Sequence, residues 1–310
     1  MGINNIGELN DYIIKNGAKD LVQLSEIIQD YKLFNIAEEI VLNKDNYKII
    51  LLSGPSSSGK TTTAMKLSLY LRSMGLNPNH LSIDDYFHER DETPLGADGK
   101  PDFESLRAVD TKLFDNQVSK LLKGIKVTVP TFNFIMGKKE YKRNIIMKEK
   151  DVLIIEGLHA LNENLLTKIP SKNKYKIYVS PLTYLNIDNE NRISMTDLRL
   201  LRRIVRDNRT RGYDPQTTIK NWNSVREGEE KFVFPYQDNA NVIFNSSLAY
   251  ELGVLKIYAE PLLYTIKQDN SEYETVQRLL ELLKCSMPIS SEYIPKTSIL
   301  REFIGDSYFE

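Results

Sequence analysis

The sequence predicts an α/β fold in three layers, with helices on both faces of a parallel sheet. Short runs of β-branched and aliphatic residues that end in glycine or polar residues predict buried strands, and stretches with helical spacing of apolar residues separate them. Strands that alternate with helices in this way form parallel sheets whose two faces are covered. A chain of 310 residues is long enough for one large domain of this kind with additional segments.

Residues 1–46 are predicted to form a helical segment ahead of the sheet. Leu21, Leu24, Ile27 and Ile28 recur at helical spacing, and we expect two or three short helices here. The N-terminus lacks a basic stretch followed by an apolar one, and no window approaches the roughly 18 uninterrupted apolar residues of a membrane span. We therefore expect no membrane association and a cytoplasmic location.

Five runs are the predicted strands of a domain that covers residues 47–268. The first, "YKIILLSG", begins at Tyr47, and a weaker run, "NHLSIDD", ends at Asp85. We expect these two strands to be neighbours in the sheet. The other three runs are "DVLIIEG" (151–157), "YKIYVS" (175–180) and "NVIFNS" (241–246).

Two further elements are predicted outside the sheet. "IKVTVPTFNF" and the residues up to "KRNIIM" alternate apolar and polar residues around Pro130 and Gly137. This pattern predicts an antiparallel hairpin that stands off the sheet as a flap over the substrate. The C-terminal extension, residues 269–310, contains "YETVQRLLELLKCSM", which predicts an amphipathic helix.

A phosphate-binding loop follows the first strand. Residues 54–61, "GPSSSGKT", match the pattern GxxxxGK[ST] and precede the helical run "TTTAMKLSLYLRSMG". Backbone N–H groups of such a P-loop surround the phosphates of a nucleotide, Lys60 reaches the β and γ phosphates, and the Thr61 hydroxyl is placed to bind Mg²⁺. The predicted ATP-binding residues here are Gly54, Ser56, Ser57, Ser58, Gly59, Lys60, Thr61 and Thr62.

Carboxylates at strand ends are the candidate catalytic and metal-binding groups. Asp84 and Asp85 follow the "LSI" strand, at the edge where ligands bind in open α/β sheets. One of them is placed to accept a proton from an attacking hydroxyl, although an acidic pair that caps the next element is the alternative. Glu156 ends "VLIIEG" after four apolar residues and is the candidate for contact with Mg²⁺. His159 is either a further ligand or a structural residue.

An arginine-rich helix is predicted over "NRISMTDLRLLRRIVRDNRTRGYD". It holds seven arginines and no lysine, while Leu198, Leu201 and Val205 form an apolar stripe. Planar contacts to phosphate or carboxylate suit arginine, so the helix is a candidate lid over a transferring phosphoryl group. A solvated helix face and a contact with an RNA or DNA backbone are the alternatives. The formal charge of −1 and the lack of another basic cluster argue against nucleic acid.

Six motifs of this chain resemble those of the uridine kinase and phosphoribulokinase family of P-loop phosphotransferases. In chain order they are the P-loop, "SIDDYF", "PDFESLRAVD", "VPTFNF", "IIEGLHAL" and "LRLLRRIVRDNRTRG". The resemblance covers roughly residues 47–267. It is closer still to bacterial nucleoside-kinase-like proteins in which a module similar to the N-terminal region of threonyl-tRNA synthetase precedes the kinase domain. That module is not seen here, so residues 1–46 resemble the connecting helices of a shorter or trimmed form.

The resemblance implies roles for residues at matching positions. Asp84 matches the catalytic acid/base and acceptor ligand, and Glu156 matches the carboxylate near the metal, with ATP and Mg²⁺ as cofactors. Glu104 falls where uridine kinases have an aspartate that binds the ribose hydroxyls. The candidate lid arginines, which contact phosphates and substrate, are Arg203, Arg206 and Arg211. We count Lys60, Arg206 and Arg211 with Asp84 as catalytic, Arg203 as ATP-binding, and Tyr86 and Phe132 as further substrate contacts.

Departures from the family pattern leave the acceptor open. Phe132 and Gly137 stand where uridine kinases carry the tyrosine and histidine that read the base, and Tyr213 replaces a lid arginine. A nucleoside or a related sugar is the expected small-molecule acceptor. The alternatives are a sugar-phosphate kinase like phosphoribulokinase and an ATP-binding regulatory or RNA-associated module without turnover. Lys138, Lys139, Lys142 and Arg143 would hold the second phosphate in the former. By analogy with the family, the chain could form a homo-oligomer.

Overall fold

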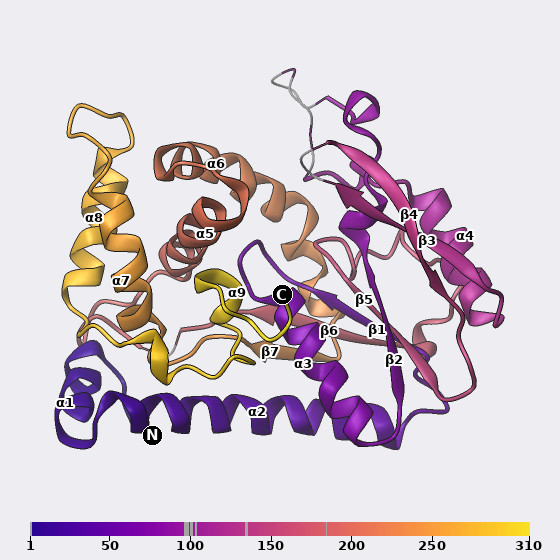
Figure 1. Ribbon diagram of the computed structural model, residues 1–310, viewed down its shortest axis with the longest axis horizontal. Coiled ribbons are helices and arrows are strands. Elements are labelled where there is room, and N and C mark those ends of the chain that lie inside the picture. Colours follow the sequence, from indigo (N-terminus) through magenta and orange to yellow (C-terminus); the bar gives the residue numbers. More distant parts are fainter. Residues whose placement is uncertain (1, 96–98, 100–101, 103, 134–135, 184) are drawn as a thin grey trace.

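The computed structural model describes residues 2–310 apart from 96–98, 100–101, 103, 134–135 and 184. Pro101, Phe103 and Phe134, which belong to the motifs above, lie outside the described residues. Five parallel strands form the central sheet in the order β2-β5-β1-β6-β7 (Figure 1). All five predicted strands are confirmed: β1 (Ile49–Ser53), β2 (Asn77–Ser82), β5 (Asp151–Glu156), β6 (Lys174–Ser180) and β7 (Val242–Asn245).

Alternate side chains of the strands enter two separate cores, one on each face of the sheet. Ile50 and Leu52 of β1 pack into one core with α2, α3, α5 and α7, whereas Ile49 and Leu51 pack into the other with α4 and the hairpin. Both faces are therefore covered, as the apolar strands require. The helices concerned are α2 (Ala18–Leu42), α3 (Lys60–Ser73), α4 (Thr111–Leu122), α5 (Met195–Arg211) and α7 (Glu251–Leu263).

The position expected for β2 is wrong. We expected β2 beside β1, but β5 lies between them, and β2 pairs with β5 from Asn77↔Asp151 to Ser82↔Glu156. The partner of a strand depends on tertiary packing, which the local sequence pattern does not carry. The result brings Glu156, at the end of β5, between the P-loop after β1 and the acidic pair after β2.

The N-terminal segment forms two helices, and the expectation that both are short is wrong. After α1 (Ile6–Asn16), Gly17 at φ +89° makes the turn, and α2 then runs unbroken for 25 residues along one edge of the molecule (Figure 1). The buried face of α2 includes Leu33 and Ile36, while Leu24 and Ile27 of the predicted stripe are exposed. Apolar residues surround this helix, so periodicity alone does not identify its core side.

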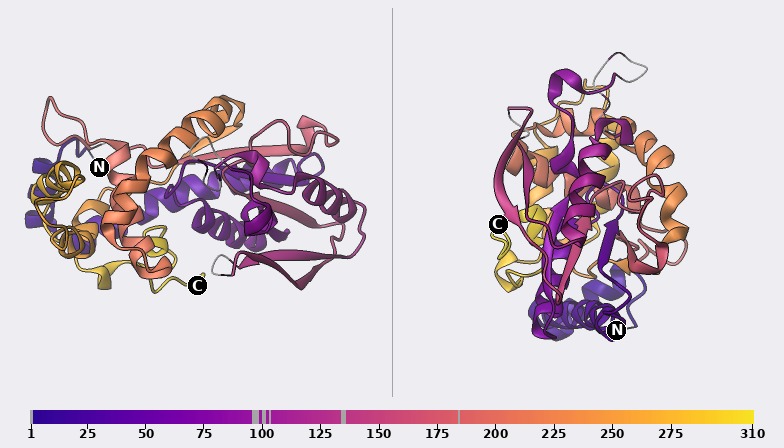
Figure 2. Two further views of the ribbon diagram at one scale, coloured as in Figure 1. Left: turned by 90° about the horizontal axis from the view of Figure 1, so that it is seen from above. Right: turned by 90° about the vertical axis from the view of Figure 1, so that its right-hand side faces the viewer.

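The predicted hairpin is confirmed. β3 (Val127–Asn133) pairs antiparallel with β4 (Lys138–Ile145), and both strands lie outside the five-stranded sheet (Figure 2). The ladder shifts register between Val129 and Pro130, because proline cannot donate to the partner strand. The hairpin packs on α4 and on the short 3-10 helix η1 (Ile83–Tyr86), which carries the acidic pair.

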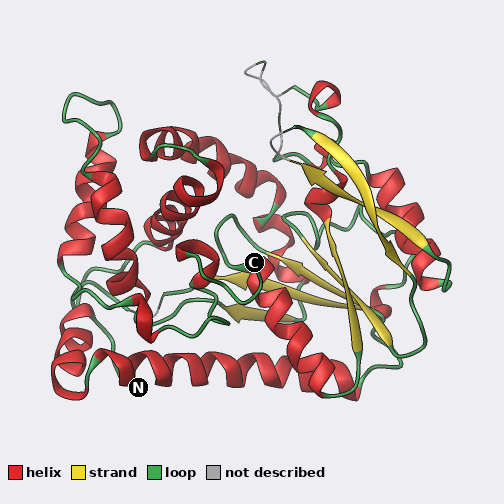
Figure 3. Cartoon of the chain, viewed as in Figure 1, coloured by secondary structure: helices red, strands yellow, loops and turns green. Residues whose placement is uncertain are grey.

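The helices that follow β6 in the chain gather beside the sheet (Figure 1, Figure 3). The arginine-rich helix α5 packs against α6, α7 and α9, and the predicted amphipathic helix of the tail is confirmed as α8. Ile299 and Phe303 of the tail share one core with β1 and α2. None of the helices within the described residues has both the length and the apolar character to cross a membrane. The remaining helices are α6 (Pro215–Phe232), α8 (Tyr273–Lys284) and α9 (Arg301–Ile304).

Candidate active site

The P-loop joins β1 to α3 in a path that only glycine permits at two points. A Cβ added to Gly54 would lie 2.0 Å from the Val179 carbonyl oxygen of β6. Gly59 has φ +85°, and a Cβ there would lie 2.5 Å from the Ile299 side chain. Ser57 also has a positive φ of 58°. The glycines of the motif are thus explained by close backbone packing and by the left-handed turn that starts α3.

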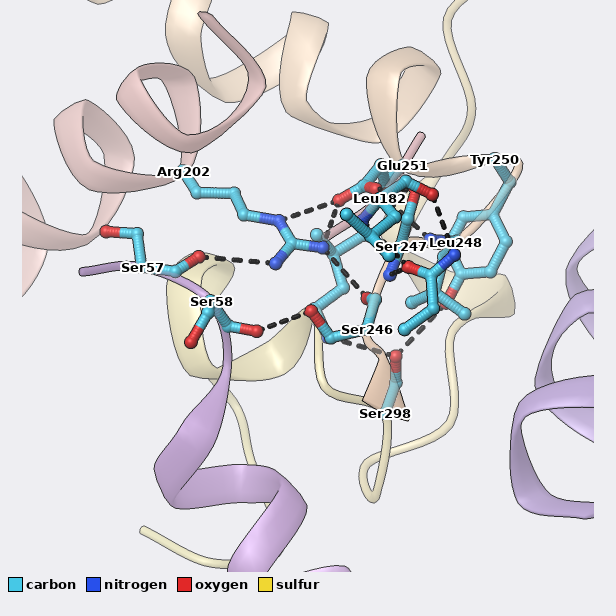
Figure 4. Close-up of polar contacts among 12 residues, drawn as sticks. Ser57, Ser58, Leu182, Arg202, Ser246, Ser247, Leu248, Tyr250, Glu251 and Ser298 are labelled. Atoms are coloured by element: carbon cyan, nitrogen blue, oxygen red, sulfur yellow. Dashed lines mark hydrogen bonds and ion pairs between the residues drawn. The ribbon is translucent and has the colours of Figure 1, made fainter. Parts of the chain in front are cut away.

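Buried polar groups hold the outside of the P-loop (Figure 4). Arg202 is fully buried, and its guanidinium donates to the Ser57 carbonyl at 3.3 Å and to the Ser246 carbonyl at 3.0 Å. Its charge is balanced by Glu251 at 2.6 Å. The Ser246 hydroxyl in turn donates to the Ser58 carbonyl. Because these carbonyls are engaged from outside, the loop is preorganised before any phosphate binds.

A second buried ion pair supports the start of the loop. Arg199 pairs with Glu229 of α6, and its Nε donates to the Ser56 carbonyl at 2.9 Å. Glu229 is 0% exposed and accepts the Ser56 backbone N–H at 2.6 Å. The Arg199 guanidinium also lies 5.1 Å from the ring centre of Trp222, so this tryptophan packs within the protein rather than serving as an exposed stacking platform.

Lys60, Asp84 and Glu156 come together above the P-loop. Burial raises the pKa of Asp84, while the positive charges of Lys60, Arg211 and Arg206 oppose that shift. Burial, reinforced by the Asp84 charge, raises the pKa of Glu156 to about 7. Burial also lowers the pKa of Lys60, against the nearby Glu156 and Asp84 charges. The three predicted residues therefore share one electrostatic environment, although they lie at or after the ends of three different strands.

The predicted metal ligands are adjacent. The Thr61 hydroxyl donates to Glu156 Oε2 at 3.4 Å, at the mouth of the P-loop. A hydroxyl and a carboxylate are hard oxygen donors, and Mg²⁺ in nucleotide sites takes only one or two protein ligands beside water and phosphate oxygens. The side chains present therefore fit Mg²⁺. Within the described part of the chain, no group of three or more His, Cys, Asp or Glu side chains forms a metal cage.

One aspartate organises the three candidate lid arginines. Asp207 is 1% exposed and lies 3.1 Å from Arg203, 2.8 Å from Arg206 and 3.6 Å from Arg211. Arg203 also donates to the Ser56 hydroxyl at 2.7 Å, and the charges of Arg206 and Arg211 act on Asp84. A shared counter-ion thus gathers the three arginines, with Arg203 in contact with the P-loop and with Arg206 and Arg211 near enough to act on Asp84.

Glu104 lies against α6 with an unused oxygen. Gly228 makes room for it, since a Cβ at position 228 would lie 2.6 Å from the Glu104 Cβ. Its Oε2 is buried and has no hydrogen-bond partner within the described residues. Burial raises the pKa of Glu104 to about 7, partly offset by the Arg203 charge. A buried acceptor without a donor is costly, and the hydroxyl of a bound ligand would satisfy it.

The structure does not bring Tyr86 to this group. Its ring is fully buried against Phe114, and its hydroxyl donates to Gln117 at 2.8 Å inside the second core. Phe132 lies closer than Tyr86 to the acidic pair. Its backbone N–H donates to Asp85 Oδ1 at 3.0 Å and so links the hairpin to the residues after β2. Burial lowers the pKa of His159 to about 4, so its ring is neutral at pH 7.

Sequence reasoning missed four residues that shape the site: Glu229, Ser246, Asp207 and Glu302. Asp207 left a readable signal, because it stands four residues after Arg203 and four before Arg211, the spacing of ion pairs on one helix face. The other three lie in α6, after β7 and in the tail, far from the P-loop in sequence. Only the tertiary fold brings them to the loop.

Known proteins resemble this chain over its central part. A model of the phosphoribulokinase / uridine kinase family matches residues 49–251. The uridine kinase of Staphylococcus epidermidis is 30% identical over 214 residues, which cover 67% of this chain and 94% of that protein. The uridine kinase of Borreliella burgdorferi is 30% identical over 200 residues, or 63% of this chain and 85% of that one. The solved structure of a possible uridine kinase from Bacillus stearothermophilus aligns with a TM-score of 0.44 and 17% identity, covering 69% of this chain and 100% of that one.

Proposed function

Because the chain belongs to the phosphoribulokinase / uridine kinase family, we propose that this P-loop kinase uses ATP and Mg²⁺ to phosphorylate a hydroxyl group of a nucleoside. The observation that carries the proposal is that Asp84 lies close enough to Lys60 of the P-loop and to Glu156 for their charges to act on one another. A kinase needs a base for the acceptor hydroxyl next to the groups that hold the triphosphate, and these residues supply both.

In the proposed reaction, the acceptor oxygen attacks the γ phosphorus, and the bond to the β–γ bridging oxygen breaks to release ADP. The hydroxyl proton passes to Asp84. Lys60 and the backbone amides of the P-loop hold the β and γ phosphates, while Arg206 and Arg211 stabilise the charge that develops on the transferred group. Mg²⁺, held by Thr61 and with Glu156 beside it, would neutralise phosphate charge when bound.

The raised pKa of Asp84 suits this role. A carboxylate in water is a weak base, and burial makes Asp84 a better proton acceptor, while the charges of Lys60 and the arginines favour its ionised form. Glu104, with its unused buried oxygen, is proposed to accept hydrogen bonds from the sugar hydroxyls of the acceptor. The similarity to proteins named uridine kinase favours a uridine- or cytidine-like nucleoside over an unrelated alcohol.

A sugar-phosphate acceptor is less well supported. It requires cationic residues for a second phosphate, and three of the four hairpin candidates already have partners. Lys139 pairs with Asp110, Lys142 with Glu140, and Arg143 donates to the His80 carbonyl. An RNA-associated module is also less well supported, because Arg199 and Arg202 are buried. The cytoplasmic location and the homo-oligomer stay predictions.

The test is ATP consumption, measured by ADP formation, against a panel of nucleosides, pentoses and pentose phosphates. Lys60→Ala is the blank, because it removes the phosphate-binding ammonium. We expect a nucleoside to raise turnover well above the blank and a pentose phosphate to leave it unchanged. Turnover with pentose phosphates alone would replace the nucleoside proposal, and binding of ATP without turnover on any acceptor would favour a regulatory module.

A further inference from the structure

A carboxylate from the C-terminal segment lies at the start of the P-loop helix. Glu302 of α9 accepts hydrogen bonds from the Thr62 backbone N–H at 3.2 Å and from the Thr62 hydroxyl at 2.8 Å. Thr62 is 240 residues away in the chain and lies in the first turn of α3. Gly59, which caps this helix, has no side chain to satisfy its N–H groups. Glu302 therefore supplies the missing capping group.

This position is one that an anion of the nucleotide would otherwise take. The N–H groups at the start of the helix after a P-loop bind phosphate oxygens, and Thr62 is among the residues predicted to bind ATP. The Glu302 charge also acts on Lys60 and on Glu156, so the carboxylate faces the phosphate-binding region rather than solvent. A phosphate and this carboxylate would repel each other at the same donors.

The backbone around Glu302 is firmly held, whereas its side chain is only partly buried. Phe303 and Ile304 belong to the core, Ile299 packs on Gly59, and Arg209 donates to the Glu302 and Phe303 carbonyls at 3.1 and 3.3 Å. The segment is thus fixed by its backbone contacts, and release of Thr62 requires only that the partly buried Glu302 side chain change its rotamer. Movement of one side chain is enough to exchange the carboxylate for a phosphate.

We propose that Glu302 sets the nucleotide affinity of this kinase: its carboxylate occupies a phosphate position at Thr62 and must leave before the nucleotide binds. The proposal rests on the proposed function, since it assumes that the P-loop holds ATP. Binding then carries the cost of releasing Glu302, and the apparent affinity falls by the fraction of molecules in which the position is open. Because Glu302 competes with a phosphate group, it should not change the affinity of ligands that lack phosphate.

The test compares ATP and adenosine binding by calorimetry in the full-length wild type, Glu302→Gln and Asp306→Asn. Glutamine keeps the shape of Glu302 and removes its charge. Asp306→Asn removes an equal charge from the same segment, but the Asp306 carboxylate pairs with Lys296 rather than with the loop. We expect Glu302→Gln to bind ATP about tenfold more tightly, because hydrogen bonds to a charged acceptor are roughly twice as strong as neutral ones. Adenosine binding and the Asp306→Asn protein should match the wild type.

Several outcomes would overturn the proposal. Equal or weaker ATP binding by Glu302→Gln would mean that the carboxylate is a permanent cap that coexists with the nucleotide, while ATP binding by the wild type would leave the proposed function intact. If Asp306→Asn gained as much ATP affinity as Glu302→Gln, the effect would come from the net charge of the segment rather than from the contact with Thr62. If neither the wild type nor Glu302→Gln bound ATP, the inference and the proposed function would both fail. Tighter binding by Glu302→Gln alone supports both.

Discussion

Asp84 is the residue on which the proposed chemistry depends most directly. It lies in the short helix η1 after β2, and its charge is balanced by Lys60, Arg206 and Arg211 rather than by a single partner. Burial raises the pKa of such a base and makes it a better proton acceptor than an exposed aspartate, while the neighbouring positive charges oppose the shift. In the proposed reaction the same residues hold the triphosphate, so the base and the phosphate would be positioned together.

Replacing Asp84 tests this assignment. Asp84→Asn keeps the size of the side chain but cannot take the proton of the acceptor, so we expect kcat to fall about 10²- to 10⁴-fold while ATP binding is retained. The measurements are kcat from ADP formation and the ATP dissociation constant from calorimetry. Asp85→Asn, next to it in the chain, is the matched control; an equal loss there, or unchanged turnover in Asp84→Asn, would contradict the assignment.

The raised pKa of Glu104 predicts how the free energy of unfolding changes with pH. Burial raises its pKa from 4.5 to about 7, so between these values the folded protein holds a proton that the unfolded chain has lost. Stability must therefore fall as pH rises through this window, by at most about 1.4 kcal/mol per pH unit for one group. Urea unfolding of the ligand-free protein should show this slope, and Glu104→Gln should reduce it. An unchanged slope in Glu104→Gln would count against a buried, protonated Glu104.

Among the elements, α5 acts differently from a solvated arginine helix. Arg199 and Arg202 point inward to support the P-loop, whereas Arg203, Arg206 and Arg211 gather on Asp207 beside the site. One helix therefore supports the loop from outside and, in the proposed reaction, would present cations to the transferred group. Any change in how α5 packs on α7 should affect both phosphate binding and turnover.

The support of the P-loop from outside can be tested through Ser246, which follows β7 and whose hydroxyl donates to the Ser58 carbonyl. Ser246→Ala removes one buried hydrogen bond, a loss of about 1 kcal/mol, so we expect the KM for ATP to rise several-fold with little change in kcat. Ser73→Ala is the control, because it removes a hydroxyl that donates a hydrogen bond to the Tyr70 carbonyl at the far end of α3. An unchanged KM in Ser246→Ala would show that the loop holds its shape without this contact.

At the scale of the whole molecule, the N-terminal helices and the C-terminal tail share the core of the kinase domain. Leu33 of α2 and Ile299 of the tail belong to the same cluster as Ile50 of β1. Lys66 of α3 is buried and pairs with Asp30 of α2 at 2.6 Å. The P-loop helix is thus held by α2 on one side and by the tail at its start, so these segments are expected to unfold together.

Leu33→Ala tests this shared core. Leu33 is 1% exposed, and truncation of a buried leucine costs about 2–5 kcal/mol. We expect the whole protein to lose this stability in one transition, with Trp222 fluorescence in α6 and far-UV circular dichroism changing at the same urea concentration. Ile14→Ala, at 72% exposure, should leave the transition in place. Two separate transitions in Leu33→Ala would mean that α2 is an independent unit.

The sequence by itself predicted the alternation of strands and helices, the P-loop, the hairpin and the acidic residues at strand ends. These features depend on the spacing of apolar residues, the placement of glycines and the cost of burying a carboxylate, which are all local properties of the chain. Only the tertiary structure decided that β5 lies between β1 and β2, that α2 buries Leu33 rather than Ile27, and that Tyr86 belongs to the core. It also brought Glu229, Ser246 and Glu302 to the P-loop. Contacts between residues far apart in the chain depend on how helices and strands pack, and no local pattern encodes that packing.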